Sequence, residues 1–168
     1  MTARLTQQKA GEANDFAEYP VYTGVTLQVG HLVMLNSSGY AVPVTAATGL
    51  KCAGVCDSQC RGAIPASLGQ IVNGGASGSV WVRVKRGTFA FDNSSVTPLA
   101  MGKCGQLAFA ESGYVVSEAT ATTSVAGIVD RYVAATDVGA EQQMGAAQVW
   151  VQVGMRAQPP TNYLTGYA

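Results

Sequence analysis

A short valine-rich pattern occurs twice in this chain and holds both of its tryptophans. The sequence VWVRVKR at residues 80–86 returns as VWVQV at residues 149–153. Valine at every second position places one face of a β-strand in a core, and the β-branched and aromatic content favours the same conformation. The pattern therefore predicts two half-buried strands that occupy similar places in the fold.

Two further motifs recur upstream of these strands in the same order. SGYAV at residues 38–42 returns as SGYVV at 112–116, and AGVCD at 53–57 returns as AGIVD at 126–130. A looser match relates Val25, Thr26, Leu27 and Gly30 to Val96, Thr97, Leu99 and Gly102. Ordered recurrence is typical of a duplicated structural unit, although β-proteins also reuse Gly-Tyr turns and valine-rich strands without duplication. We predict two similar halves, at about residues 24–91 and 96–155.

Short strands with frequent turn residues, and no helical period of useful length, favour an all-β fold. Two similar halves favour a closed or nearly closed β-barrel over a sandwich, because closure removes exposed sheet edges. Pro43 lies within an alternating segment and predicts an edge strand, since proline cannot donate a ladder hydrogen bond. We expect an N-terminal arm at residues 1–23, a β domain at 24–155 and a C-terminal tail at 156–168.

The chain is poor in charge. Hydrophobic residues make up 48% of it and charged residues 12%, with a formal net charge of zero. Such a balance favours association over a dispersed monomer. It also disfavours nucleic acid as a partner, because phosphate binding needs clustered Lys and Arg. No segment reaches the length of a membrane span, and the N-terminal residues lack the apolar core of a signal peptide.

Both ends of the chain carry aromatic residues outside any clear period. Tyrosine supplies contact area with a polar tip, which suits a protein interface. We therefore expect the arm and the tail to dock on a neighbouring subunit or shell. The candidate partner-interface residues are Phe16, Tyr19, Tyr22, Tyr163, Leu164 and Tyr167.

Residues that could carry chemistry are scattered. His31 is the single histidine and has no partner motif, so we expect a structural or surface role. Cys52, Cys56 and Cys60 are spaced Cys-x3-Cys-x3-Cys, whereas zinc sites usually pair ligands as Cys-x2-Cys. We expect reduced thiols, with Cys52 and Cys56 on one strand face. The sequence predicts no catalytic, metal or cofactor-binding residues.

An ordered set of motifs resembles the small decoration (cement) proteins of tailed-bacteriophage heads. It comprises GVTL at 24–27, GHLV at 30–33, SGYAVP at 38–43, AGV at 53–55, VRVKRG at 82–87 and FDNS at 91–94. The resemblance implies a β-barrel-like or tulip-like fold and binding to the major capsid protein on the outside of the shell. It also implies assembly as homotrimers or dimers, and a place on the virion surface after synthesis in the bacterial cytoplasm. The tail and the cysteine spacing have no counterpart in that pattern.

Two other functions fit the same residues. The first is a carbohydrate- or ligand-binding β-module, in which Trp81, Trp150, Tyr40 or Tyr114 would stack on a sugar. That reading requires the rings to be exposed together on one face. The second is another structural component of a phage tail or head fibre.

Overall fold

The computed structural model describes residues 15–62, 69–134 and 147–154. Within these ranges the fold is all-β apart from one short 3-10 helix, as predicted. The strands are β1 (Asp15–Pro20), β2 (Thr26–Gln28), β3 (Leu32–Leu35), β4 (Ala41–Pro43), β5 (Lys51–Arg61), β6 (Gln70–Val72), β7 (Trp81–Asn93), β8 (Leu107–Ala110), β9 (Val115–Ser117), β10 (Ser124–Val133) and β11 (Gln148–Val153). One short 3-10 helix, η1, spans Met101–Lys103.

The C-terminal half of the described chain is a closed five-stranded barrel. β8 pairs with β9 and β10, and β10 pairs with β11. The second part of β7, residues 87–93, pairs antiparallel with β11 and parallel with β9. These pairings complete a ring, which we call the second barrel. The prediction of a small barrel is confirmed, and closure leaves this part of the sheet without a free edge.

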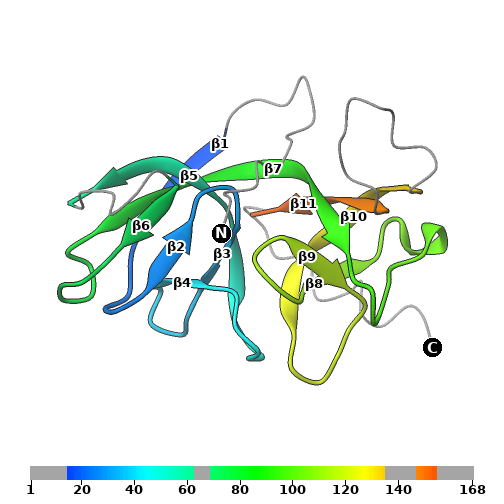
Figure 1. Cartoon of the computed structure of the whole chain (residues 1–168), viewed down its shortest axis with the longest axis horizontal. Coiled ribbons are helices and arrows are strands. Elements are labelled where there is room, and N and C mark those ends of the chain that lie inside the picture. The colour runs from blue at the N-terminus through cyan, green and yellow to red at the C-terminus, as the bar shows by residue number, and fades with distance from the viewer. Residues whose placement is uncertain (1–14, 63–68, 135–146, 155–168) are drawn as a thin grey trace.

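The N-terminal half repeats the same ring. β3 pairs with β4 and β5, and β5 pairs with the first part of β7, residues 81–86. β1 pairs antiparallel with that part of β7. A parallel bridge between Val21 and Ala41 joins the end of β1 to β4. In this first barrel the small β2–β6 sheet is an addition. Figure 1 shows β7 running from the first barrel into the second.

The hydrogen-bond registers of the two halves correspond across the pairs that flank the first bulge of β5 and β10 and at the ring closure. The pairs Val33↔Gly54 and Met34↔Cys52 flank a bulge at Ala53. The pairs Ala108↔Gly127 and Phe109↔Val125 flank the same bulge at Ala126. At the ring closure, the Tyr22 N–H donates to the Ala41 carbonyl, and the Ser94 N–H donates to the Val116 carbonyl. The predicted duplication is thus confirmed by pairing geometry.

Three details of the sequence alignment between the halves are wrong. The β3–β4 turn closes from Asn36 to Tyr40 and the β8–β9 turn from Glu111 to Val115, so the SGY motif is shifted by one position within equivalent turns. Val84 pairs with Cys56 as Val151 pairs with Val129, so Trp81 corresponds to Gln148 rather than Trp150. Gly30 corresponds to Gly105, because their N–H groups donate to the equivalent carbonyls of Cys56 and Val129.

Residues 15–20 were expected in an arm, but they form strand β1 of the first barrel. This part of the N-terminal prediction is wrong because residues 15–20 do not show the alternation of apolar inward and polar outward residues that identifies a half-buried strand. The inward positions are Ala17 and Tyr19, while the outward Phe16 is apolar and 38% exposed. By the pairing, one structural repeat covers residues 15–86 and the other covers 87–154. Residues 1–14 and 155–168 lie outside the described chain, so the rest of the arm and the tail stay predictions.

Each barrel encloses its own apolar core. The first core includes Val33, Ala41, Val82 and Val84, with Leu27 and Ile71 from the β2–β6 sheet. The second core is larger and is built around Phe89 and Phe91. It also takes in Leu32, Met34 and Val55, which lie on the outer face of the first barrel. The two barrels are therefore packed together through apolar side chains as well as joined by β7.

Candidate partner-binding surfaces

The outer face of the first barrel carries a three-member charge network. Strand β5 bulges between Cys56 and Cys60, and this irregularity contains Asp57. The Asp57 side chain lies against the outward residues Arg83 and Lys85 of β7. Arg83 Nε donates to Asp57 Oδ2 at 2.6 Å and its Nη2 forms an ion pair with the same oxygen, while Lys85 Nζ lies 3.2 Å from Oδ1.

Asp57 is only 5% exposed. Burial alone would raise the pKa of its carboxyl group. The hydrogen bonds from Arg83 and Lys85, helped by the Ser58 backbone, outweigh burial and hold the pKa below the ordinary value. Asp57 is therefore charged at neutral pH. Its two cationic partners keep about a third of their side chains exposed, so the network presents basic groups fixed in position.

Aromatic rings lie beneath the arginines of this face. The Arg83 guanidinium sits 4.4 Å from the centre of the Phe16 ring, and the Arg61 guanidinium sits 4.9 Å from the Trp81 ring. Arg61 also lies 3.7 Å from Glu18. Cation–π contact of this kind orders exposed cations and keeps the aromatic faces partly dry. The face formed by β1, β5 and β7 is thus rigid, mixed in charge and partly aromatic.

The predicted interface residues at the N-terminal end fall into two environments. Phe16 is on the outer face just described. The Tyr19 ring points toward the first core, and its hydroxyl accepts a hydrogen bond from Arg86 Nη2 at 2.7 Å. Tyr22 is 41% exposed and lies 5.9 Å from Tyr40, ring centre to ring centre. Phe16 and Tyr22 are therefore available to a partner, while Tyr19 is tied to the barrel.

The C-terminal candidates, Tyr163, Leu164 and Tyr167, lie outside the described residues.

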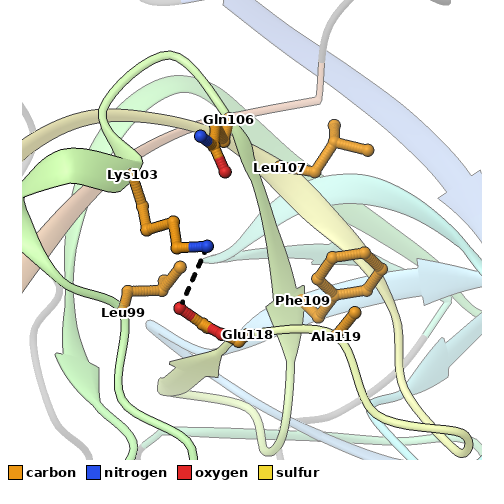
Figure 2. Close-up of a pocket in the computed structure, with 7 residues that line it drawn as sticks. All are labelled: Leu99, Lys103, Gln106, Leu107, Phe109, Glu118 and Ala119. Atoms are coloured by element: carbon orange, nitrogen blue, oxygen red, sulfur yellow. Dashed lines mark ion pairs between the residues drawn. The ribbon is translucent and has the colours of Figure 1, made fainter. Parts of the chain in front are cut away.

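The second barrel has a hollow on its outer surface. A cavity of about 330 Å3 lies over β8 and the segments that flank it. Figure 2 shows Leu107 and Phe109 from β8 at its wall and the ion pair between Lys103 and Glu118, 3.4 Å apart, across it. Val125, which pairs with Phe109 across the sheet, is 39% exposed. This apolar area was not predicted from the sequence.

Each of the four rings proposed as a sugar platform contacts another side chain. Trp150 is 7% exposed, with the Arg131 guanidinium 4.9 Å from its ring centre. Trp81 lies against Arg61, Tyr40 against Tyr22, and Tyr114 against His31. A stacking platform requires open ring faces, and these rings already contact other side chains.

The potentially reactive groups are largely buried or engaged. Burial raises the pKa of Cys52 to about 11 and that of Cys56 to about 12, so both thiols are protonated at neutral pH. Cys56 faces the first core, whereas Cys52 lies beside Met34 on the outer face of the first barrel and packs against the second core. The expectation of one shared face is wrong, because the bulge at Ala53 reverses the alternation. Burial lowers the pKa of His31, whose ring lies 5.2 Å from Tyr114 between the barrels.

The described residues contain no group of three or more His, Cys, Asp or Glu side chains placed to hold a metal ion. Only part of the charge network of Asp57, Arg83 and Lys85 could be inferred from the sequence. Arg83 and Lys85 are two positions apart in the valine-alternating segment, so the sequence places them on one strand face. Asp57 could be added to them only from the strand pairing, because its partners are 26 and 28 residues away in the chain (83 − 57 and 85 − 57).

None of the described helical segments is long and apolar enough to cross a lipid bilayer. No protein-family model matches the chain, and no curated protein matches it in sequence. The structure is similar to a chain in the solved structure described as "The capsid of Myoviridae Phage XM1". The TM-score is 0.51 at 12% sequence identity, and the match covers 88% of both chains. At this identity the likeness establishes a common fold.

Proposed function

We propose that this protein is a structural component of a tailed-bacteriophage head that binds the outside of the shell and stabilises it. The observation that carries the proposal is the fold likeness to a chain of a phage capsid structure over 88% of both chains. A match of that extent cannot be confined to one of the two barrels. The sequence motifs that resemble decoration proteins support the same role. The partner is the major capsid protein, and the protein acts on the virion surface after synthesis in the bacterial cytoplasm.

A rigid double barrel suits such a role. Stabilising a shell requires added contacts across subunit boundaries, each spanning a standard interface of roughly 800 Å2 per partner. The face around Phe16 holds its cations in fixed positions, so little side-chain entropy is lost when they meet an acidic surface. We assign the shell-binding surface to this face and to Tyr22, together with residues 1–14 and 155–168, which include Tyr163, Leu164 and Tyr167.

The proposal is tested with shells assembled from the major capsid protein of the phage that encodes this chain. The protein should co-sediment with these shells to a saturating stoichiometry and raise the temperature at which they disrupt. The result that would contradict the proposal is a protein that stays in the supernatant and leaves the disruption temperature unchanged. Phe16→Asp should weaken binding, because a carboxylate would replace the ring beneath Arg83 while the inner face of β1 stays intact.

Truncation tests the contribution of the terminal segments. Removal of residues 1–14 and 155–168 should abolish co-sedimentation and leave both barrels folded, because the strands that pair to form the two barrels lie between Asp15 and Val153. Removal of residues 1–20 serves as the matched control. It deletes β1 and should unfold the first barrel, as measured by circular dichroism. If the protein without residues 1–14 and 155–168 still binds shells fully, these terminal segments are not part of the interface.

A further inference from the structure

The duplication places the same surface in two different situations. In the first barrel the outer face of β3 and β5 is closed off by the second barrel, and Leu32, Met34 and Val55 are 1%, 0% and 2% exposed. The equivalent outward pairs of the second barrel are Leu107↔Ile128 and Phe109↔Val125. There Val125 is 39% exposed, and the other three are partly exposed. One copy of the face is covered and the other is open. We call the open copy the β8–β10 face.

The cavity over β8 shows the same difference between the covered face of the first barrel and the open face of the second. It is lined by Gln106, Leu107 and Phe109 among others. By the pairing these residues correspond to His31, Leu32 and Met34 in the first barrel. There the equivalent space is occupied by the β8–β9 turn.

Two contacts hold that turn in place. The Leu32 N–H donates to the Gly113 carbonyl at 2.6 Å, and His31 lies against Tyr114. Position 113 has no room for a side chain, since a Cβ there would lie 2.5 Å from His31 Nδ1. The cavity on the second barrel in Figure 2 is therefore the unoccupied equivalent of the site on the first barrel that holds the β8–β9 turn.

The turn that occupies this site also has an equivalent in the other half of the chain. The β8–β9 turn is seated on the first barrel, and the β3–β4 turn is closed by the same backbone hydrogen bond, from Asn36 N–H to the Tyr40 carbonyl. Its tip, Ser37, Ser38 and Gly39, is exposed. Ser38 corresponds to Gly113 and would oppose the flexible, exposed Gln106 in place of the His31 ring. Each chain thus has one unoccupied site, on the β8–β10 face, and one exposed turn, between β3 and β4. Their equivalents in the other halves contact each other within the same chain.

We propose that the β8–β10 face binds the β3–β4 turn end of the first barrel of a second copy of this chain. The contact repeats between molecules the packing seen between the two barrels of one molecule. Asp15 and Gly154 both correspond to Gly87, where β7 crosses between barrels. In the docked pair, Gly154 of one copy lies beside Asp15 of the next. Because the two surfaces differ, the interface is head-to-tail, and repetition gives a closed ring or an open chain.

The proposal concerns contacts between copies of this chain and does not depend on capsid binding, so it is tested on the purified protein alone. At roughly 10 µM, a range in which interfaces of standard size assemble, light scattering should give a multiple of the 17.3 kDa chain mass. Two face variants, Val125→Asp and Gln106→Trp, and one turn variant, Ser38→Trp, should each weaken association by at least about thirtyfold and run as monomers.

A mixing experiment tests the head-to-tail geometry. A face variant retains a normal turn, and the turn variant retains a normal face. An equimolar mixture should therefore form dimers of twice the chain mass and nothing larger. Gln59→Asp is the control, because Gln59 is exposed on β5 of the first barrel and lies on neither of the two proposed surfaces, so this variant should associate as the unmodified protein does.

Gln106 and Ser38 are exposed, so their variants retain a folded chain even if Val125→Asp does not. A monomeric unmodified protein, folded variants that stay associated, or a mixture that stays monomeric would each overturn the proposal. Loss of shell binding with intact self-association would overturn the proposed function instead.

Discussion

In the first barrel the inward residues of the opening strand are Ala17 and Tyr19, and in the second barrel the equivalent residues are Phe89 and Phe91. The volume that two phenylalanines supply in the second barrel is supplied in the first partly by Leu27 and Ile71 of the β2–β6 sheet. The pairing frame is the same in both, yet side chains from different elements fill it. Backbone register is thus the retained property of the duplication, and core filling is the exchangeable one.

The two barrels differ in the charged contacts made at the equivalent bulges of β5 and β10. Asp57 is buried between Arg83 and Lys85, whereas Asp130 is exposed. In the second barrel the neighbouring arginine, Arg131, lies on Trp150. One bulge therefore organises a surface charge network, and the other covers a tryptophan.

Phe89→Ala should produce the largest loss, because it gives the second barrel the residue found at the equivalent position of the first without the β2–β6 filling. Phe89 is 1% exposed, and its removal should lower the free energy of unfolding by about 3–5 kcal/mol. Urea unfolding measures this. The reciprocal change Ala17→Phe should cost less, about 1–3 kcal/mol, through overpacking. A loss below about 1 kcal/mol for Phe89→Ala would show that the cores are not filled as described.

Gly127→Ala and Gly54→Ala test whether the two bulges demand glycine for the same reason. An added Cβ would lie 2.0 Å from the Gln152 carbonyl oxygen in one case and 2.3 Å from the Lys85 carbonyl oxygen in the other. Each should lower the free energy of unfolding by roughly 3 kcal/mol, since backbone must move. Gly102→Ala, with open space around it, should be nearly neutral. Similar stability of all three variants would contradict the close strand approach at the bulges.

Asp57→Asn should have a smaller effect and should distinguish the two bulges by charge. It removes the acceptor of Arg83 and Lys85, and we expect a loss of about 1–2 kcal/mol, discounted because both cations are partly exposed. Asp130→Asn should change stability by less than about 0.5 kcal/mol. Equal effects of the two variants would contradict the burial difference.

The pH dependence gives a second readout for Asp57. Because folding lowers its pKa, the carboxylate stabilises the folded state fully above the ordinary value of 3.8, and this contribution is lost as the pH falls through the lower folded value. The stability difference between the unmodified protein and Asp57→Asn should therefore be constant near pH 7 and shrink below pH 3.8. Urea midpoints across this range measure it. A difference that grows in acid would contradict the pKa direction.

The sequence was sufficient to predict the β class, the barrel and the duplication, because alternation and ordered motifs report which face of a strand is buried. Ala53-Gly54 and Ala126-Gly127 were matched correctly, since each pair occupies an equivalent bulge. The tryptophans were matched two residues out of register. A shift of two keeps every side chain on its face, so alternation cannot detect it.

Other features depend on contacts between distant segments. β1 was missed because its outward Phe16 is stabilised by Arg83, a contact that no local pattern records. The β8–β10 face was missed for a related reason. Its residues have the same apolar character as Leu32 and Met34, and only the packing of the barrels shows which set is covered. Surface candidates such as Phe16 and Tyr22 could be named, but the charge network beside Phe16 required the pairing of β5 with β7.

Strand β7 is the last strand of one barrel and the first of the other, and it continues through Gly87 without a break. A tensile load applied at one barrel would therefore reach its neighbour along a single hydrogen-bonded backbone, with no flexible hinge to absorb it. Neither barrel can lose this strand without opening the other, so the two should melt as one cooperative unit.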